Sequence, residues 1–154
     1  MHFEIFSPAF SSGAMIPVRH TCSGEDVSPP LAWSNVPSAA KSLALICEDP
    51  DAPGGTFYHL GIYDLPATQT SLAEGVDTKS MPKGAKAVRN SFGSADYRGP
   101  CPPTAHGIHH YHFRLFALST PNLTIGKGAD CQILLALMLP HVVATTEVIG
   151  TFAR

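Results

Sequence analysis

The chain has 154 residues, which suits one domain, and 44% of them are hydrophobic, enough for a packed core. Its formal charge is −2, and no basic cluster is long enough for a nucleic-acid-binding face or for an anionic lipid surface. Charged residues make up only 14%, while 13 glycines and 14 prolines predict many turns and few long helices. We expect a single domain over residues 1–154 that does not bind nucleic acid.

The apolar segments and the cysteines predict a location for the protein. Residues 1–6 lack the basic region and the apolar run of a signal peptide. The most apolar stretch, residues 131–146, is too short and too interrupted to span a bilayer. The cysteines contain no C-x-x-C motif, so we expect reduced thiols, no membrane insertion and a cytoplasmic protein. The four are Cys22, Cys47, Cys101 and Cys131.

Short apolar and β-branched segments recur between turn signals, which predicts a mostly β protein. The expected extended segments are residues 3–6, 28–33, 42–48, 57–65, 109–118 and 147–152. The run at 42–48 is almost continuously apolar, so we expect a central strand there. One helix is expected over 132–139, with Asp130 as its N-cap and Pro140 near its end. Because this helix is apolar nearly all round, we expect it to pack into the core. The whole pattern favours an antiparallel sandwich with a peripheral helix.

Alternation along two strands divides their side chains between faces. In 109–118, the odd-numbered residues become apolar sooner and are assigned inward. His109 and Tyr111 are then the inward-facing residues at the start of the strand, beside a pocket. The even-numbered residues His110, His112 and Arg114 are expected on a solvated face. In 57–65, strict alternation puts His59 on one face with Gly61, Tyr63 and Leu65, away from Leu60 and Ile62.

The loop that follows the central strand is the first candidate site. Asp49 and Asp51 flank Pro50, and Pro53 stiffens the loop further. Rigid loops at strand ends are common places for binding residues. The alternative is a turn with two solvated aspartates. For His59, the alternative to a functional role is a packed, hydrogen-bonded strand histidine.

A second candidate segment begins at Gly99 and Pro100 and leads into the strand at His109. Three prolines in four positions predict a stiff extended rim, and glycine allows close approach of a ligand to the backbone. Two other chemistries compete here. His110 and His112 form an H-x-H pair of the kind that binds metals, and Cys101 with His106 or His109 has the composition of a cysteine nucleophile. Flanking prolines and the lack of a helix start disfavour the nucleophile, and the chain has no G-x-S-x-G motif.

Taken in order, these segments resemble the phosphatidylethanolamine-binding (Raf-kinase-inhibitor-like) protein family, in its short prokaryotic branch. The motifs that carry the resemblance are Asp49-Pro50-Asp51-Ala52-Pro53, His59 after a tyrosine, Gly99-Pro100-Cys101-Pro102-Pro103, and His109-x-Tyr111. The run from Ile16 to Trp33, the segment 89–93 and the ending 150–154 are also similar, so the resemblance covers nearly the whole chain. Five positions depart from the family's usual residues, namely Phe57, Tyr58, Ser91, His110 and Phe152.

The resemblance implies a large central antiparallel sheet, a smaller sheet against it, a few peripheral helices and a small anion pocket. That pocket would use Asp49, Asp51, His59, Gly99, His109 and Tyr111, with Pro100 and Phe57 as walls. It would take phosphate or a phospholipid head group without a cofactor. The family also implies a non-enzymatic modulator of a kinase or protease, and homodimers occur among its short members.

Two aspartates beside an anion need an explanation. We expect them to accept hydrogen bonds from the histidines, which orients the rings and favours their charged form. Tyr111 and a backbone N–H near Gly99 would add donors. The alternative function is a metal-dependent or acid–base enzyme that uses the same His/Asp cluster.

Overall fold

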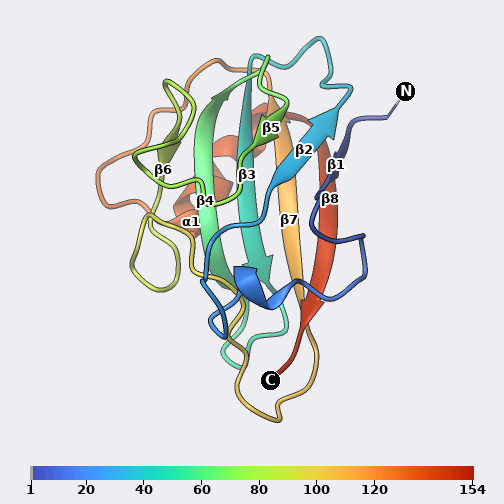
Figure 1. The fold of residues 1–154 in the computed structure, drawn as a ribbon. Coiled ribbons are helices and arrows are strands. Elements are labelled where there is room, and N and C mark those ends of the chain that lie inside the picture. The colour runs from blue at the N-terminus through green and yellow to red at the C-terminus, as the bar shows by residue number, and fades with distance from the viewer. Residues whose placement is uncertain (1) are drawn as a thin grey trace.

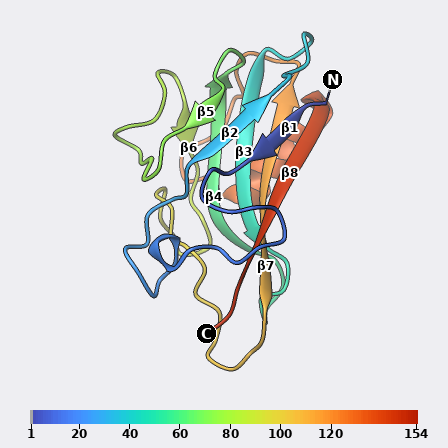
Figure 2. The ribbon, with the colours of Figure 1, turned by 45° about the vertical axis from the view of Figure 1, so that its right-hand side comes forward.

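In the computed structural model, which describes residues 2–154, two antiparallel sheets lie face to face and one helix covers the outer face of the larger sheet (Figures 1 and 2). This confirms the mostly β, two-sheet fold. The large sheet has the order β6 (Lys86–Ala87), β4 (Phe57–Pro66), β3 (Ser42–Asp49), β7 (His109–Leu118) and β8 (Val142–Phe152). The small sheet consists of β1 (Glu4–Phe6), β2 (Leu31–Ser34) and β5 (Ser71–Leu72). The helix is α1 (Cys131–Met138), and 3-10 turns occupy Val18–His20 and Leu139–His141.

The central strand β3 separates two apolar cores. Leu43 and Leu45 lie in the core between the sheets, whereas Ala44 and Ile46 lie in the core beneath α1. All four residues have no exposed surface. Both faces of β3 are therefore covered, which explains why its sequence is almost continuously apolar rather than alternating. Its predicted central position is confirmed.

Strand β7 has the predicted bounds, and its inward face is the predicted one. Tyr111, Phe113 and Leu115 are buried in the core between the sheets. On the other face, the side chain of His110 is 52% exposed, as expected for a solvated position. Further along the same face, however, Phe116 is buried because α1 covers the far half of the strand.

Strand β4 departs from simple alternation, and the predicted division of its faces is wrong. Its pairing with β3 shifts by one residue between Tyr58 and Leu60, so that His59 is an extra residue in a β-bulge. A second shift lies between Ile62 and Leu65, where Asp64 has a left-handed backbone with φ of 57°. As a result Leu60, Ile62 and Leu65 all lie in the core between the sheets.

The helix has the predicted N-cap and begins one residue before its predicted start, but its environment differs. The Asp130 carboxylate accepts a hydrogen bond from the Ile133 backbone N–H at 3.0 Å, and the helix gives way to a 3-10 turn that contains Pro140. Only one face is buried, whereas Ile133 and Leu137 are more than 40% exposed. The expectation of a fully buried helix is therefore wrong, because α1 lies on the outside of the sheet and has protein on one side only.

Strand β8 is longer than predicted, since Val142–Thr146 continues the strand expected from residue 147. The apolar character of 131–146 thus belongs to a helix, a turn and half a strand, which are three elements rather than one. Among residues 2–154, no helix is long and apolar enough to cross a membrane.

The close contact between β8 and the N-terminal segment leads to a prediction. A Cβ atom on Gly150 would lie 2.4 Å from Cγ1 of Ile16, which is fully buried, and 2.9 Å from the ring of Phe10. We expect Gly150→Ala to lower the free energy of unfolding by about 1–3 kcal/mol, as overpacked cores do. Gly126→Ala is the control, because a Cβ there meets nothing within 4 Å. Equal denaturant midpoints for the two variants would contradict the close contact.

Candidate functional site

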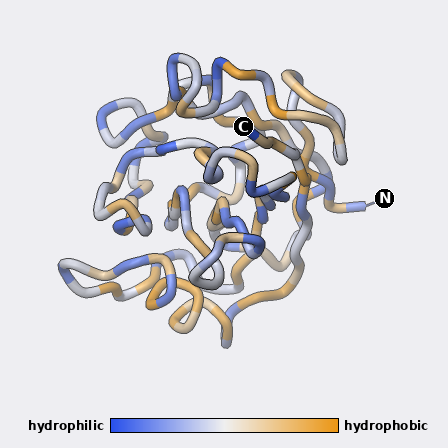
Figure 3. Tube along the Cα trace, turned by 90° about the horizontal axis from the view of Figure 1, so that it is seen from below, coloured by the Kyte–Doolittle hydropathy of each residue, from blue (hydrophilic) through white to orange (hydrophobic). Residues whose placement is uncertain are grey.

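A cavity of about 210 Å³ lies where β3 ends and where β4 and β7 begin. Because β3 runs antiparallel to both neighbours, its last residues and the first residues of β4 and β7 meet at the same end of the sheet. This end of the sheet is at the bottom of Figure 1, near the C-terminus, and Figure 3 looks onto it. The lining residues are Asp49, Ala52, Pro53, Phe57, His59, Phe92, Cys101, Pro102, Pro103, His109 and Tyr111.

A chain of hydrogen bonds runs from the buried end of β3 to an exposed loop. Asp49 is only 3% exposed, and its Oδ1 accepts a hydrogen bond from the Asp51 backbone N–H at 2.8 Å. Its Oδ2 lies 2.6 Å from Nδ1 of His109, which is also buried. The Nε2 atom of His109 lies in turn 2.6 Å from Nδ1 of His106. A carboxylate therefore orients a site histidine here, as the sequence suggested.

His59 has a different partner from the one expected. Its Nδ1 donates a hydrogen bond to the Arg98 carbonyl oxygen at 2.7 Å rather than to a carboxylate. The ring is almost fully buried, and this burial lowers the pKa of His59 below its usual value. The expectation that an aspartate charges this histidine is wrong, and the neutral ring is favoured instead.

Aromatic rings hold His59 in place. The centroids of Phe57, Tyr111 and Phe92 lie 5.2, 5.4 and 5.5 Å from that of the imidazole. Burial raises the pKa of Tyr111 far above its usual value, so the phenol stays protonated. Tyr111 lines the cavity, its hydroxyl makes no hydrogen bond with another of residues 2–154, and it is not among their fully buried polar atoms that lack a partner. The cavity therefore contains one O–H donor that is free for a ligand.

Comparison with known proteins agrees with this arrangement of strands and side chains. Residues 6–153 match the family model described as Phosphatidylethanolamine-binding protein. The chain belongs to the phosphatidylethanolamine-binding protein (PEBP) family. It is 46% identical over 147 residues to a UPF0098 protein of Methanothermobacter thermautotrophicus, with 95% of each chain covered.

Two solved PEBP-family structures are also similar over nearly the whole chain. The crystal structure of E. coli YbcL, described as a new member of the mammalian PEBP family, has a TM-score of 0.95 and 31% identity, and covers 100% of this chain and 99% of its own. A PEBP homologue from Chlamydia trachomatis has a TM-score of 0.88 and 38% identity, with 99% and 97% covered.

Three residues expected in the pocket of this PEBP lie beside the cavity instead. The Asp51 carboxylate accepts hydrogen bonds from the backbone N–H and from Nδ1 of His110, both at 2.8 Å, and this pairing lowers the pKa of Asp51. The Gly99 backbone N–H donates to Asp26 at 2.8 Å, so it is not available to a ligand. Pro100 accepts a hydrogen bond from the Cys22 backbone N–H at 3.1 Å. These residues fix the loops around the cavity.

Other residues of the cavity were not predicted from the sequence as site residues. Phe92 arrives from a distant loop, and only the fold brings it to His59. The prolines at 102 and 103 had a local signal, since their run predicted a stiff rim next to the site. His106 was considered only as a partner for Cys101, and its contact with His109 was missed. The unpredicted lining residues are Ala52, Pro53, Phe92, Cys101, Pro102 and Pro103.

The expectation of four reduced thiols is wrong. Cys22 and Cys101 form a disulfide, which joins the segment after the first 3-10 turn to the wall of the cavity. Two residues 79 positions apart carry no local signal of pairing. Cys101 is consequently not a free nucleophile. Cys47 and Cys131 remain as buried thiols, and burial raises the pKa of both.

Both histidines of the H-x-H pair of β7 contact carboxylates. His110 contacts Asp51, and Nδ1 of His112 lies 2.9 Å from Oε2 of Glu147 on β8. Within the described part of the chain, no group of three His, Cys, Asp or Glu side chains has the arrangement of a metal site. Carboxylate pairing on the sheet surface accounts for both histidines.

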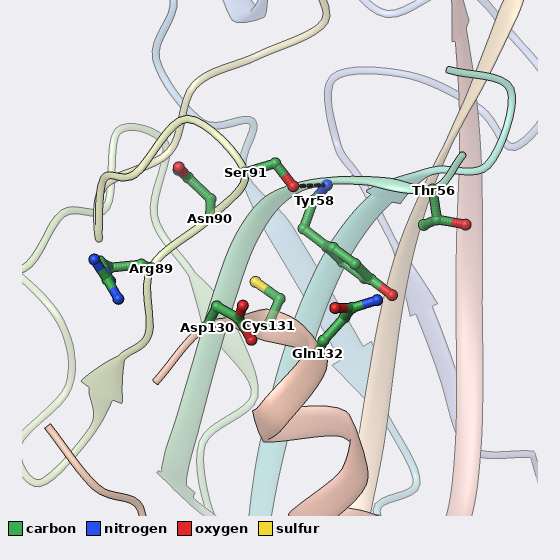
Figure 4. A pocket seen from close by; sticks show the side chains of 8 residues that line it. All are labelled: Thr56, Tyr58, Arg89, Asn90, Ser91, Asp130, Cys131 and Gln132. Carbon is green, nitrogen blue, oxygen red and sulfur yellow. Dashed lines mark hydrogen bonds between the residues drawn. The ribbon is translucent and has the colours of Figure 1, made fainter. Parts of the chain in front are cut away.

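A second cavity, of about 160 Å³, lies on the α1 side of β4 (Figure 4). Most of its polar side chains make hydrogen bonds with other groups of the protein. The Arg89 guanidinium donates to the Gly128 carbonyl at 2.6 Å, the Asp130 carboxylate caps α1, and Ser91 accepts a hydrogen bond from the Tyr58 backbone N–H. We therefore place the candidate site in the cavity around His59 and Tyr111, and the cavity of Figure 4 supplies control positions.

The disulfide gives a direct prediction. Under denaturing conditions we expect two titratable thiols without reductant and four after reduction, because two of the four cysteines are paired. Reduction should also lower the free energy of unfolding by about 2–4 kcal/mol, since the bond closes a long loop. A Cys22→Ser, Cys101→Ser double variant is the control and should not respond to reductant. Four thiols in the unreduced protein would contradict the pairing.

Proposed function

We propose that this PEBP-family protein binds a small phosphate-like anion, free or as a phospholipid head group, in the cavity at the ends of β3, β4 and β7. The observation that carries the proposal is that Tyr111, whose hydroxyl has no hydrogen-bond partner among residues 2–154, lines the cavity beside the ring of His59. The volume of about 210 Å³ is below the roughly 300–1,000 Å³ of pockets that enclose drug-sized molecules. A head group fits such a space, and acyl chains would lie outside it.

The charges of the cavity determine how such an anion would bind. The Nδ1–H group of His59 donates a hydrogen bond to the Arg98 carbonyl oxygen, so the neutral ring offers a ligand only the lone pair at Nε2. Tyr111 offers a donor, and the buried Asp49 carboxylate disfavours a nearby anion. A ligand that brings its own proton, such as the phosphate monoanion, can accept from Tyr111 and donate to His59. A ligand without a proton needs His59 to be charged.

We expect phosphate affinity to rise as the pH falls from 7.5 to 5.5. Burial lowers the pKa of His59, so its charged form gains population only as the solution becomes acidic. Protonation of the ring favours an anion by at most about tenfold per pH unit. Two protonations contribute to this dependence, that of His59 and that of phosphate itself, which takes up a proton in this range. Sulfate does not, so its binding isolates the contribution of His59. Calorimetry at both pH values should show phosphate binding that strengthens in acid. Affinity that is flat or falls in acid would contradict the proposed binding mode.

The hydroxyl of Tyr111 should be required. We expect Tyr111→Phe to weaken phosphate binding at pH 5.5 by about tenfold or more, because a hydrogen bond to a charged group contributes roughly 1.5–3 kcal/mol. Tyr58→Phe is the matched control, since Tyr58 lines the cavity of Figure 4 on the other face of the sheet. NMR titration measures both. An equal loss in the two variants, or no loss in either, would argue against the proposed site.

The alternative of an acid–base enzyme draws on one feature, the bond between Asp49 and His109, which is how enzymes orient a histidine base. In this structure the second nitrogen of His109 is held by His106, and Cys101, the candidate nucleophile beside it, is in a disulfide. We therefore propose a binding protein rather than an enzyme. A screen with phosphate and carboxylate esters would reveal turnover if His109 does act as a base.

Partners and location remain part of the proposal. A kinase or protease target and a homodimer are predictions from the family resemblance alone. Pull-down with wild type and His59→Ala would reveal whether an occupied cavity controls a partner. The predicted cytoplasmic location no longer has reduced thiols as its support, because the Cys22–Cys101 disulfide is stable where the surroundings are oxidising.

A further inference from the structure

The proton positions around His109 can be deduced from its partners. The Asp49 carboxylate only accepts hydrogen bonds, so the short contact of 2.6 Å requires a proton on Nδ1 of His109. In the neutral ring Nε2 then carries a lone pair. The contact of 2.6 Å between this atom and Nδ1 of His106 requires a proton on His106. Both nitrogens of His109 are therefore engaged within the protein.

We propose that His106 is an internal occupant of Nε2 of His109: His109 lines the cavity, the His106 Nδ1–H holds its Nε2 atom, and a ligand can bond to that atom only by displacing the His106 side chain. This inference rests on the proposed anion-binding function and adds to it a residue that regulates access. The two histidines differ in the way such a role needs. His109 is 2% exposed and fixed by Asp49, whereas His106 lies on an exposed loop and can leave without disturbing the core.

The loop that carries His106 is fastened at several points. The disulfide holds its start at Cys101, and Arg154 donates from Nε to the Pro102 carbonyl at 2.7 Å. The Ala105 backbone N–H donates to the Arg154 carbonyl at 2.9 Å. Ala105 has φ of 64°, a left-handed conformation that non-glycine residues rarely adopt. These contacts favour the turn that directs His106 toward His109, so the backbone can stay in place while the side chain moves.

Displacement of His106 would change what the cavity offers. With His106 in place, a ligand meets the hydroxyl of Tyr111 and Nε2 of His59. Without it, Nε2 of His109 becomes a third contact, which accepts from a protonated ligand or donates once the ring is charged. His106 therefore competes with the ligand, and its removal should strengthen binding.

Two substitutions test this competition. His106→Ala removes the occupant, whereas His106→Asn places an amide N–H near the position of Nδ1 and should keep His109 occupied. We expect His106→Ala to bind phosphate at least threefold more tightly than wild type at pH 5.5, and His106→Asn to remain close to wild type. Thr104→Ala is the control in the same exposed loop. Unchanged or weaker binding by His106→Ala would overturn the proposal.

A second measurement observes the contact between the two histidines directly, first in the free protein and then with phosphate. In ¹⁵N-labelled protein, the N–H···N bond should give a coupling between Nδ1 of His106 and Nε2 of His109, and saturating phosphate should abolish it. Absence of this coupling in the free protein, or its persistence at saturation, would overturn the inference. If the coupling is present but phosphate binds to no variant, the proposed anion-binding function fails while the contact between the two histidines stands.

Discussion

The buried carboxylate of Asp49 is the contact on which the rest of the site depends. It ends the central strand, accepts a hydrogen bond from the next loop through Asp51, and orients His109 at the start of β7. A charge removed from water is costly unless hydrogen bonds replace its hydration. Asp49 accepts both hydrogen bonds from segments that meet at this end of the sheet. The same bonds that make its burial tolerable therefore hold the site together.

The β-bulge at His59 provides the second constraint. It places an extra residue in β4 just where that strand passes the cavity, and it directs the histidine toward Tyr111. The Nδ1–H group of the neutral ring then donates a hydrogen bond to the Arg98 carbonyl oxygen, which leaves the lone pair at Nε2. Backbone geometry and a backbone acceptor thus decide what this histidine presents to a ligand. Substitution of neighbouring side chains would alter this less than a change in the register of the strand.

How far the sequence predicts the molecule depends on the range of the interactions. Alternation in 109–118 correctly gave the strand and the inward position of His109 and Tyr111, because that pattern is local. Strict alternation failed in β4, since a bulge is set by pairing with β3. The disulfide and the contact of Phe92 with His59 join segments that are distant in the sequence, so no local sequence pattern predicts them. Of the eight residues expected in the pocket, Asp51, Gly99 and Pro100 do not line the cavity, and their hydrogen bonds hold the surrounding loops.

The site also shows why histidines beside aspartates need not make a positively charged pocket. The carboxylate of Asp49 compensates any charge on His109, and burial disfavours a charge on His59. What remains at neutral pH is a set of directed donors and acceptors around a small space. In the proposed binding mode, such a cavity would select a ligand by the positions of the ligand's protons as much as by its charge. A phosphate that carries one proton would meet that requirement, whereas an ion without a proton would need His59 to be protonated first.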